Sequence, residues 1–224
     1  MADVGQRGLP QNLLFDLDGT LLDSLPGIAF SVGEALRAAG LPEREFDLRR
    51  LIGPPIRTIL SKVVESEDAA LLDELERHFR ASYDSAGWAK TPLYAGAAEL
   101  LRAMKASGRR LFVVSNKPRH ISVRILEVEG VVELFDELVT RDSKVPAHAD
   151  KLEMLTYLLV KWKISPGECL MIGDTTEDAV AASATDIPFC LMTHGYGDVP
   201  VESKVPVAFR LDHFSGLMPR RVQE

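Results

Sequence analysis

The sequence predicts an α/β fold: a mainly parallel β-sheet covered by helices on both faces, with a helical segment inserted after the first strand. From residue 93 onward, short apolar runs typical of strands alternate with helical patterns, which is the order of a parallel sheet. Residues 24 to about 90 carry helical patterns only. We therefore expect a core of residues 1–22 and 92–224 and an inserted helical domain, the cap, of residues 23–91.

Local patterns place the individual elements. The first strand is the apolar run over residues 13–16, which is too short for a helix and lacks a helical period. In the cap, helices are expected over residues 24–39, 56–64 and 67–85, with a shorter one within 41–50. In the core, we expect helices over residues 96–107, 118–129, 150–162 and 175–183, and strands over 110–115, 138–140, 169–172, 189–192 and 207–211.

The composition is that of an ordinary folded protein with an acidic surplus. Of 224 residues, 26% are charged and 46% are hydrophobic, and the formal net charge is −7. This charge argues against a nucleic-acid or anionic-membrane binder, because both partners require a basic face. No apolar run approaches the roughly 18 residues that span a bilayer. A small phosphorylated metabolite remains a compatible partner, since it needs only local positive groups.

Two cysteines indicate the cellular compartment. Cys169 and Cys190 are the only cysteines, and both lie in apolar, strand-like runs. Neither has the spacing of a metal site. We expect buried free thiols, which fit a cytoplasmic location. Nothing in the sequence predicts an oligomeric state.

An acidic motif directly follows the first strand. Alternation along an extended chain places Asp16 and Asp18 on one side of the backbone and Leu17 on the other. Gly19 allows a sharp exit from the strand, and Thr20 adds a hydroxyl and a backbone N–H. Two neighbouring carboxylates repel one another, so they need a cation, a shared proton or open water. Mg²⁺, which also bridges phosphate, would satisfy this need; the alternative is a solvated acidic turn.

Polar residues also follow the other expected strands. In parallel sheets, ligands bind outside the carboxyl ends of the strands. Acids at this edge would hold a cation, whereas hydroxyl, amide and ammonium groups would hold a phosphate. The residues concerned are Ser115, Asn116, Lys151, Asp174 and Asp178.

Together these groups predict phosphoryl transfer. Asp16 could attack phosphorus and form an aspartyl phosphate. Mg²⁺ held by Asp16 and Asp174 would screen the approach of one anion to another. Lys151 and the Ser115 hydroxyl would neutralise charge on the phosphoryl oxygens. Asp18 would protonate the leaving oxygen and then activate water for the second step.

Each of these residues also has a purely structural interpretation. Residues 115–118 could form only a helix-capping turn. Lys151 could be an exposed residue of a first helical turn, and Lys144 is a rival for its role. Asp178 follows Thr175 by three residues, which is the spacing of a capping box. Four such motifs in this order at four strand ends nevertheless favour one shared site.

The motifs resemble those of the haloacid dehalogenase superfamily, and specifically of phosphatases similar to phosphoglycolate phosphatases. Residues 16–24 match the first motif, residues 115–116 the second, Lys151 the third and residues 173–178 the fourth. The helical insert lies where this branch carries its small α-helical cap. The family usually has a proline after the third-motif lysine, where this chain has Leu152.

This resemblance implies a Rossmann-like core, Mg²⁺ dependence and hydrolysis of a phosphate monoester through Asp16. It implies that the metal is held by the side chains of Asp16 and Asp174 and by the backbone carbonyl of Asp18. Gly19 and Thr20 are expected to contact the phosphate group.

The choice of substrate is expected to depend on the cap, which should close over the site and exclude water. Gly53, Pro54 and Arg57 are the candidate cap contacts, although Arg57 could equally be a surface residue of a helix. Phosphoglycolate, nucleotides, sugar phosphates and pyrophosphate are all substrates that the family resemblance allows.

Three other functions stay open from the sequence. A phosphosugar mutase similar to β-phosphoglucomutase would use the same pair, Asp16 and Asp18. A signalling receiver domain, a non-enzymatic phosphoacceptor, also clusters acids, a hydroxyl and a lysine on a doubly wound sheet. The helical insert and the Asp-x-Asp-Gly-Thr motif count against that interpretation. A catalytically silent binding protein could share the fold, because fold alone does not fix function.

Overall fold

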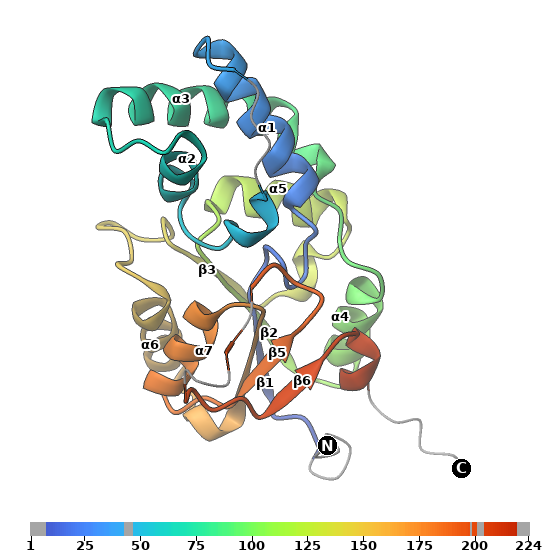
Figure 1. Ribbon diagram of the computed structural model, residues 1–224. Coiled ribbons are helices and arrows are strands. Elements are labelled where there is room, and N and C mark those ends of the chain that lie inside the picture. The colour runs from blue at the N-terminus through green and yellow to red at the C-terminus, as the bar shows by residue number, and fades with distance from the viewer. Residues whose placement is uncertain (1–7, 43–46, 198, 201–203, 219–224) are drawn as a thin grey trace.

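The protein folds around one parallel β-sheet. A computed structural model describes residues 8–42, 47–197, 199–200 and 204–218. Within these ranges, six parallel strands pair in the order β3-β2-β1-β4-β5-β6 (Figure 1). They are β1 (Asn12–Phe15), β2 (Arg110–Ser115), β3 (Glu137–Thr140), β4 (Cys169–Gly173), β5 (Phe189–Met192) and β6 (Phe209–Leu211). The prediction of an α/β fold with a parallel sheet is confirmed.

Helices cover both faces of this sheet, because successive side chains of a strand point to opposite faces. Leu13 and Phe15 of β1 belong to one buried apolar cluster, and Leu14 belongs to the other. In Figure 1, α6 and α7 lie on one side of the sheet and α4 on the other. The first cluster includes α4 (Ala97–Ala106) and α5 (Arg119–Val128), and the second includes α6 (Lys151–Trp162) and α7 (Thr176–Ala184).

The segment of residues 23–91, between β1 and β2, contains helices and no strand in its described part. Figure 1 shows its three α-helices grouped above the sheet. The chain enters and leaves this segment side by side, since the Asp23 N–H donates to the Pro92 carbonyl oxygen over 2.9 Å. The boundaries of the cap at residues 23 and 91 stay a prediction. The helices are α1 (Leu25–Ala38), α2 (Ile56–Val64) and α3 (Ala69–Ser85).

The remaining helices are single 3₁₀ turns. One of them, η2 (Leu48–Arg50), is all that the described residues form of the helix expected within residues 41–50, and residues 43–46 lie outside the description. The core residues 1–7, 198, 201–203 and 219–224 also lie outside it. None of the helices in the described part of the chain is long and apolar enough to cross a membrane. The other turns are η3 (Gly87–Lys90), η4 (Val132–Leu134), η5 (Pro166–Glu168) and η7 (Phe214–Leu217).

The register of β1 determines which polar residues meet. Phe15 pairs with Val113 of β2 on one side and with Ile172 of β4 on the other. The residues that follow these positions therefore emerge together at the carboxyl edge of the sheet, where parallel sheets bind their ligands. Asp16, at the end of β1, consequently lies between the ends of β2 and β4.

Candidate active site

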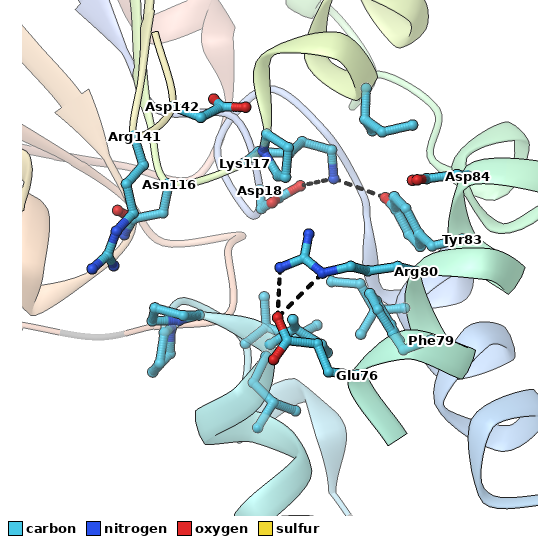
Figure 2. A pocket seen from close by; sticks show the side chains of 18 of the residues that line it. Asp18, Glu76, Phe79, Arg80, Tyr83, Asp84, Asn116, Lys117, Arg141 and Asp142 are labelled. Atoms are coloured by element: carbon cyan, nitrogen blue, oxygen red, sulfur yellow. Dashed lines mark hydrogen bonds and ion pairs between the residues drawn. The ribbon is translucent and has the colours of Figure 1, made fainter. Parts of the chain in front are cut away.

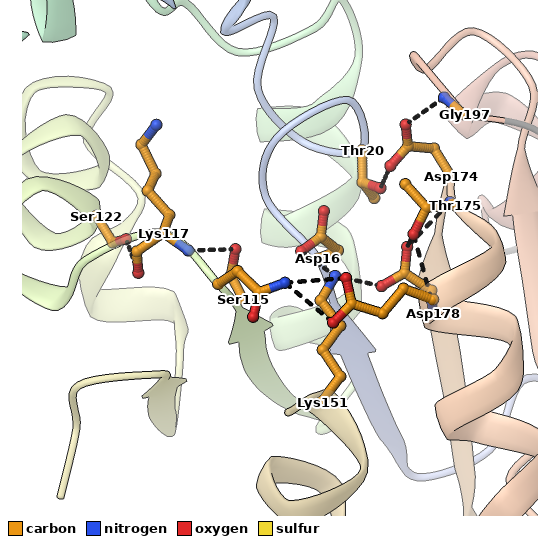
Figure 3. A network of polar contacts seen from close by, with 12 residues as sticks. Asp16, Thr20, Ser115, Lys117, Ser122, Lys151, Asp174, Thr175, Asp178 and Gly197 are labelled. Carbon is orange, nitrogen blue, oxygen red and sulfur yellow. Dashed lines mark hydrogen bonds and ion pairs between the residues drawn. The ribbon is translucent and has the colours of Figure 1, made fainter. Parts of the chain in front are cut away.

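Three buried carboxylates meet at the carboxyl edge of the sheet. Asp16 follows β1, Asp174 follows β4, and Asp178 lies in the first turn of α7. One oxygen atom from each lies within 4.8 Å of the others, and all three residues are buried. Figure 3 shows the three side chains converging from these separate segments. The structure thus brings together three of the acids that the sequence singled out.

Lys151, the first residue of α6, lies among these carboxylates. Its Nζ donates a hydrogen bond to Asp16 Oδ1 over 2.8 Å and another to Asp178. The rival Lys144 pairs instead with Glu153. Lys151 is buried, so it is not the exposed first-turn residue of the alternative interpretation.

The cluster is short of positive charge. Burial raises the pKa of Asp16 well above its usual value, and Lys151 opposes this shift only in part. Burial, with a contribution from Asp178, raises the pKa of Asp174 to about 6. Burial alone would lower the pKa of Lys151, but the carboxylates around it raise that pKa above its usual value. Three carboxylates facing one ammonium leave an excess of negative charge that a further cation would neutralise.

Asp174 is held in a narrow backbone cradle. Its Oδ2 accepts hydrogen bonds from the backbone N–H groups of Tyr196 at 2.7 Å and Gly197 at 3.1 Å. Its Oδ1 accepts one from the Thr20 hydroxyl at 3.2 Å. Gly19 has a φ of +87°, and a Cβ there would lie 2.3 Å from Asp174 Oδ2. Gly19 and Thr20, which were expected at the phosphate, therefore both contact Asp174.

Asp178 also has a structural role, because it accepts two hydrogen bonds from Thr175. Its Oδ2 accepts hydrogen bonds from the backbone N–H of Thr175 at 3.0 Å and from the Thr175 hydroxyl at 2.6 Å. The capping box suggested by the sequence is thus present at the start of α7. Because Asp178 Oδ1 also pairs with Lys151, the cap of α7 and the acidic cluster share one side chain.

The donor chemistry of this cluster fits a hard divalent cation. Carboxylate oxygens are ligands that Mg²⁺ prefers, whereas thiolate or imidazole ligands would indicate a softer metal. Among the described residues, no cysteine or histidine joins the three acids. Asp16, Asp174 and Asp178 are therefore the described residues whose side chains could hold such an ion.

Asp18 faces a different partner. Its Oδ1 accepts a hydrogen bond from Lys117 Nζ over 2.9 Å, and the same ammonium donates to the Tyr83 hydroxyl over 2.7 Å. Burial would lower the pKa of Lys117, but Asp18 and Tyr83 raise it above its usual value, so this lysine stays charged. Tyr83 belongs to α3, and Lys117 therefore connects an acid of the core to the cap.

The end of β2 lies beside the cluster but does not cap a helix. The buried hydroxyl of Ser115 accepts the backbone N–H of Lys117 at 3.3 Å. Asn116 Nδ2 donates to both carboxylate oxygens of Glu177, at 3.1 and 3.0 Å. Helix α5 begins after Pro118, and its first backbone N–H, that of Arg119, donates to the Asp142 carboxylate and not to a side chain of residues 115–118. The structure contradicts the capping-turn interpretation of residues 115–118, and it ties Asn116 to α7.

A cavity of about 450 Å³ lies between the core and the cap (Figure 2). Asp18 and Lys117 line it from the core side. Gly53 and Pro54, two of the predicted cap contacts, line it from the opposite side. Asp16 is not part of the lining, so the cavity begins on the Asp18 side of the acidic cluster.

Arg57, the third predicted cap contact, does not line this cavity. Its guanidinium pairs with Asp73 and Glu76 of α3, and so joins α2 to α3. The alternative interpretation of Arg57 as a helix surface residue describes its place in the structure. Arg80 of α3, and not Arg57, is the arginine of the cap that lines the cavity.

Two residues of the site, Lys117 and Tyr196, are not predicted from the sequence. Lys117 directly follows the predicted Ser115–Asn116 pair, and this position at a strand end was the available signal. Tyr196 holds Asp174 through its backbone, while its hydroxyl donates to Asp23 Oδ1 over 2.7 Å at the entrance to the cap. Its signal was the pair of glycines on either side, because closely spaced glycines indicate a close approach of the backbone.

Fold and site together define a class of protein that has a parallel sheet, an acid pair after the first strand and a helical segment inserted between the first two strands. The family model described as haloacid dehalogenase-like hydrolase matches residues 13–192. The chain therefore belongs to this family, and the family predicted from the sequence is confirmed. Membership also sets aside the signalling receiver domain.

Similar proteins include phosphatases and a kinase. The phosphoglycolate phosphatase of Photobacterium profundum is 33% identical over 215 residues, which cover 92% of this chain and 93% of that protein. The tyrosine-protein kinase PtkA of Mycobacterium tuberculosis is 34% identical over 189 residues, which cover 84% of this chain. The match covers only 64% of that kinase, so this chain corresponds to less than two thirds of it.

Solved structures of the family share the whole fold. A predicted phosphoglycolate phosphatase from Haemophilus somnus superposes with a TM-score of 0.80 at 29% identity, covering 92% of this chain and 95% of the other. The structure of PtkA from Mycobacterium tuberculosis also gives a TM-score of 0.80, at 31% identity, and covers 93% of this chain and 96% of that one. The Rossmann-like core and the inserted helices are thus features that this chain shares with its relatives.

Proposed function

We propose that this protein is a Mg²⁺-dependent phosphatase that hydrolyses a small phosphate monoester through an aspartyl phosphate on Asp16. The observation that carries the proposal is the contact of Asp16 with Lys151 inside a cluster of three buried carboxylates. Phosphoglycolate phosphatases at 32% and 33% identity support the same class of reaction.

In the first step, a carboxylate oxygen of Asp16 forms a bond to phosphorus while the bond from phosphorus to the leaving oxygen breaks. Asp18 donates a proton to that leaving oxygen, so the product departs as a neutral alcohol. Lys151 and Ser115 stabilise the negative charge on the oxygens of the transferred phosphoryl group. Because the cavity begins at Asp18, the departing alcohol lies between the core and the cap.

In the second step, Asp18 takes a proton from water, and the water oxygen attacks phosphorus. The bond between phosphorus and the Asp16 oxygen breaks, which releases inorganic phosphate and restores the carboxylate. Asp16 and Asp174 are the side chains that would hold Mg²⁺, together with the backbone carbonyl of Asp18. The bound ion supplies positive charge that lowers the repulsion between the Asp16 carboxylate and the phosphate dianion.

Replacing the nucleophile tests this proposal. In the Asp16→Asn variant, we expect phosphate release from a panel of phosphate esters to fall by at least about a thousandfold, because an amide oxygen is a poor nucleophile. Circular dichroism should show an unchanged fold. The Asp73→Asn variant, which changes an exposed acid of α3, is the control and should retain full activity. Substantial release by folded Asp16→Asn would refute the assignment of the nucleophile.

The Asp18→Asn variant separates the two steps. Without the acid and base, turnover should stop, but an activated ester could still phosphorylate Asp16. A phosphorylated protein detected by mass spectrometry would then identify the intermediate. The full panel should be measured with Mg²⁺ and with chelator, because the proposal requires activity only with the metal.

A phosphosugar mutase remains the second candidate, since it would use the same pair of aspartates. A coupled isomerisation assay distinguishes the two functions: a phosphatase releases inorganic phosphate, whereas a mutase keeps the phosphoryl group on the sugar. A stable phosphoprotein without turnover would indicate a binding or switching role. The proposal includes a reducing, cytoplasmic environment, which the free thiols of Cys169 and Cys190 favour.

A further inference from the structure

The cavity beside Asp18 is large for the leaving group of phosphoglycolate. Its volume of about 450 Å³ falls in the range of roughly 300–1,000 Å³ that is usual for pockets of drug-sized ligands. Asp18, which faces the leaving oxygen in the proposed reaction, lines the cavity, whereas Asp16 and Lys151 do not. The space therefore belongs to the leaving group and not to the phosphoryl group. A two-carbon acid such as glycolate would leave most of it unfilled.

The walls of this cavity are mainly apolar. Contributions come from α1, from the segment before α2, and from α2, α3 and α5, so the apolar surface surrounds the space from the cap and the core. Most of these side chains are buried, and an apolar ligand would be stabilised in proportion to the apolar surface that it covers. The apolar lining residues are Ile28, Ile52, Ile56, Ile59, Phe79 and Ile121.

The first cation of the lining is already paired with an acid. Lys117 Nζ lies 2.9 Å from Asp18 Oδ1, and it also donates to the Tyr83 hydroxyl. A carboxylate on the leaving group would have to compete with Asp18 for this ammonium. If it succeeded, it would deprive the proposed acid of its partner.

The second cation is paired as well. Arg80 Nη2 lies 2.6 Å from Glu76 Oε1, and Figure 2 shows the two side chains facing one another within the cavity. His120, also in the lining, faces Asp84 at 3.5 Å. Arg80 and His120 therefore each face a carboxylate that also lines the cavity, although Glu76 pairs with Arg57 as well.

Arg141 is the third permanent cation of the lining. Figure 2 shows its guanidinium pointing away from Asp18 and Arg80. The lining also contains four carboxylates, those of Asp18, Glu76, Asp84 and Asp142. The cavity thus has no surplus of positive charge with which to replace the hydration of an anionic leaving group.

We propose that the leaving group is an uncharged, largely apolar alcohol of at least the size of a benzyl group, and not a small carboxylic acid such as glycolate. This inference rests on the proposed phosphatase function, and it names the class of ester that the site selects. The apolar walls bind the body of the alcohol, and Asp18 protonates its oxygen. An anionic alcohol is disfavoured because it meets carboxylates whose cations are already engaged.

Three esters of primary alcohols test the proposal, because their leaving oxygens are chemically similar. Benzyl phosphate should give a kcat/KM at least tenfold above that of 2-phosphoglycolate with Mg²⁺ present. Adding a carboxylate in 4-carboxybenzyl phosphate should reduce kcat/KM at least tenfold from the benzyl value. A preference for 2-phosphoglycolate, or equal rates for the two benzyl esters, would overturn the inference and leave the phosphatase function standing.

A different result would show that the proposed phosphatase function itself is wrong. If none of these esters nor p-nitrophenyl phosphate is hydrolysed with Mg²⁺, both the function and the inference fall. Binding gives a readout that does not depend on turnover. By calorimetry, the non-hydrolysable 2-phenylethylphosphonate should bind at least tenfold more tightly than 3-phosphonopropionate, and the reverse order would contradict the proposal.

A matched pair of variants on α3 tests the role of charge pairing. Glu76→Gln releases Arg80 from its carboxylate, so the ratio of kcat/KM for benzyl phosphate over 2-phosphoglycolate should fall about tenfold. Glu74→Gln removes an acid from the same helix that does not line the cavity, and it should leave the ratio unchanged. An unchanged ratio in a folded Glu76→Gln variant, judged by its melting temperature, would count against the proposal.

Discussion

Lys151 Nζ lies 2.8 Å from Asp16 Oδ1 and also donates to Asp178, so a single buried ammonium joins two carboxylates from different segments of the chain. This arrangement holds the nucleophile of the proposed reaction in position. It also means that the site and the stability of the core depend on the same side chain, because a buried charge without its partner is strongly unfavourable.

Lys151→Met should therefore reduce both activity and stability. We expect a hundred- to thousandfold loss of kcat, in the range of about 10²–10³ for removal of a donor to the transition state. The free energy of unfolding should fall by about 3–5 kcal/mol at pH 7.5, and by less at pH 5, where the abandoned carboxylates can take up protons. Activity assays and urea denaturation at both pH values measure these effects.

The matched control is Lys144→Met. Lys144 forms a half-buried ion pair with Glu153 at the surface, where solvent screens such pairs to about 1 kcal/mol or less. This variant should remain active and nearly as stable as the wild type. A larger loss of activity in Lys144→Met than in Lys151→Met would reverse the assignment of the phosphate-binding lysine.

Mg²⁺ should stabilise the folded protein through the acidic cluster. At a hundredfold excess over its dissociation constant, a ligand adds about 2.7 kcal/mol, which for a chain of this length raises the melting temperature by about 5–10 °C. Asp174→Asn should lose this response, because it removes a carboxylate from the cluster. Asp73→Asn should keep it. A metal response of wild-type size in Asp174→Asn would place the ion elsewhere.

We expect Lys117 to affect catalysis through its ion pair with Asp18 as well as through its hydrogen bond to Tyr83 of the cap. In Lys117→Met, Asp18 loses its ammonium partner, and we expect kcat to fall about ten- to a hundredfold. In Tyr83→Phe, the ring remains and only the hydrogen bond at 2.7 Å disappears, so kcat should fall less than about fivefold. Equal losses in the two variants would show that the link to the cap, and not the pairing with Asp18, is the important one.

The position of the site could be predicted because it follows from the order of elements. Asp16, Ser115 and Asp174 each come directly after an apolar run, and in a parallel sheet such ends share one edge. Helix and strand limits were also accessible, since Gly40 and Pro118 mark them locally. These features require no knowledge of how distant segments pack.

The partners of individual side chains could not be predicted in this way. Thr20 bonds to Asp174 across 154 residues, and Asn116 bonds to Glu177 across 61 residues. Arg57 turns toward α3 because two acids of that helix attract it, and nothing around residue 57 indicates their presence. Such contacts depend on the direction of each side chain after folding, which a sequence pattern does not contain.

The buried thiols should make stability fall at alkaline pH. Burial raises the pKa of Cys190 to about 12, from a value of 9.0 for an exposed thiol. Between these two values, the unfolded chain loses the thiol proton while the folded chain keeps it, so stability is complete below pH 9 and declines as the pH rises toward 12. The slope for one thiol is about 1.4 kcal/mol per pH unit.

Cys190→Ala isolates this effect. Its free energy of unfolding should be lower than that of the wild type at pH 8, because a small cavity replaces the sulfur. The difference between variant and wild type should narrow by about 1 kcal/mol at pH 10, since the variant no longer has the titrating thiol. Denaturation curves at the two pH values measure the difference. A constant difference would mean that the thiol titrates alike in the folded and unfolded chains.

Gly19 and Gly40 both have a left-handed backbone conformation, but only Gly19 lies beside Asp174. Alanine substitutions at the two positions therefore distinguish backbone strain from a change in the shape of the site. Gly40 has a φ of +68°, and a Cβ there would meet open space, so Gly40→Ala should cost only the backbone strain of about 1–2 kcal/mol. Gly19 has a φ of +87°, but a Cβ there would lie 2.3 Å from Asp174 Oδ2 and 2.9 Å from the Tyr196 ring. Gly19→Ala must therefore displace Asp174 in addition to straining the backbone. We expect it to lose the Mg²⁺-dependent rise in melting temperature and at least about a hundredfold in kcat, whereas Gly40→Ala keeps both. If Gly19→Ala behaved like Gly40→Ala, the close approach of this turn to Asp174 would have no part in metal binding.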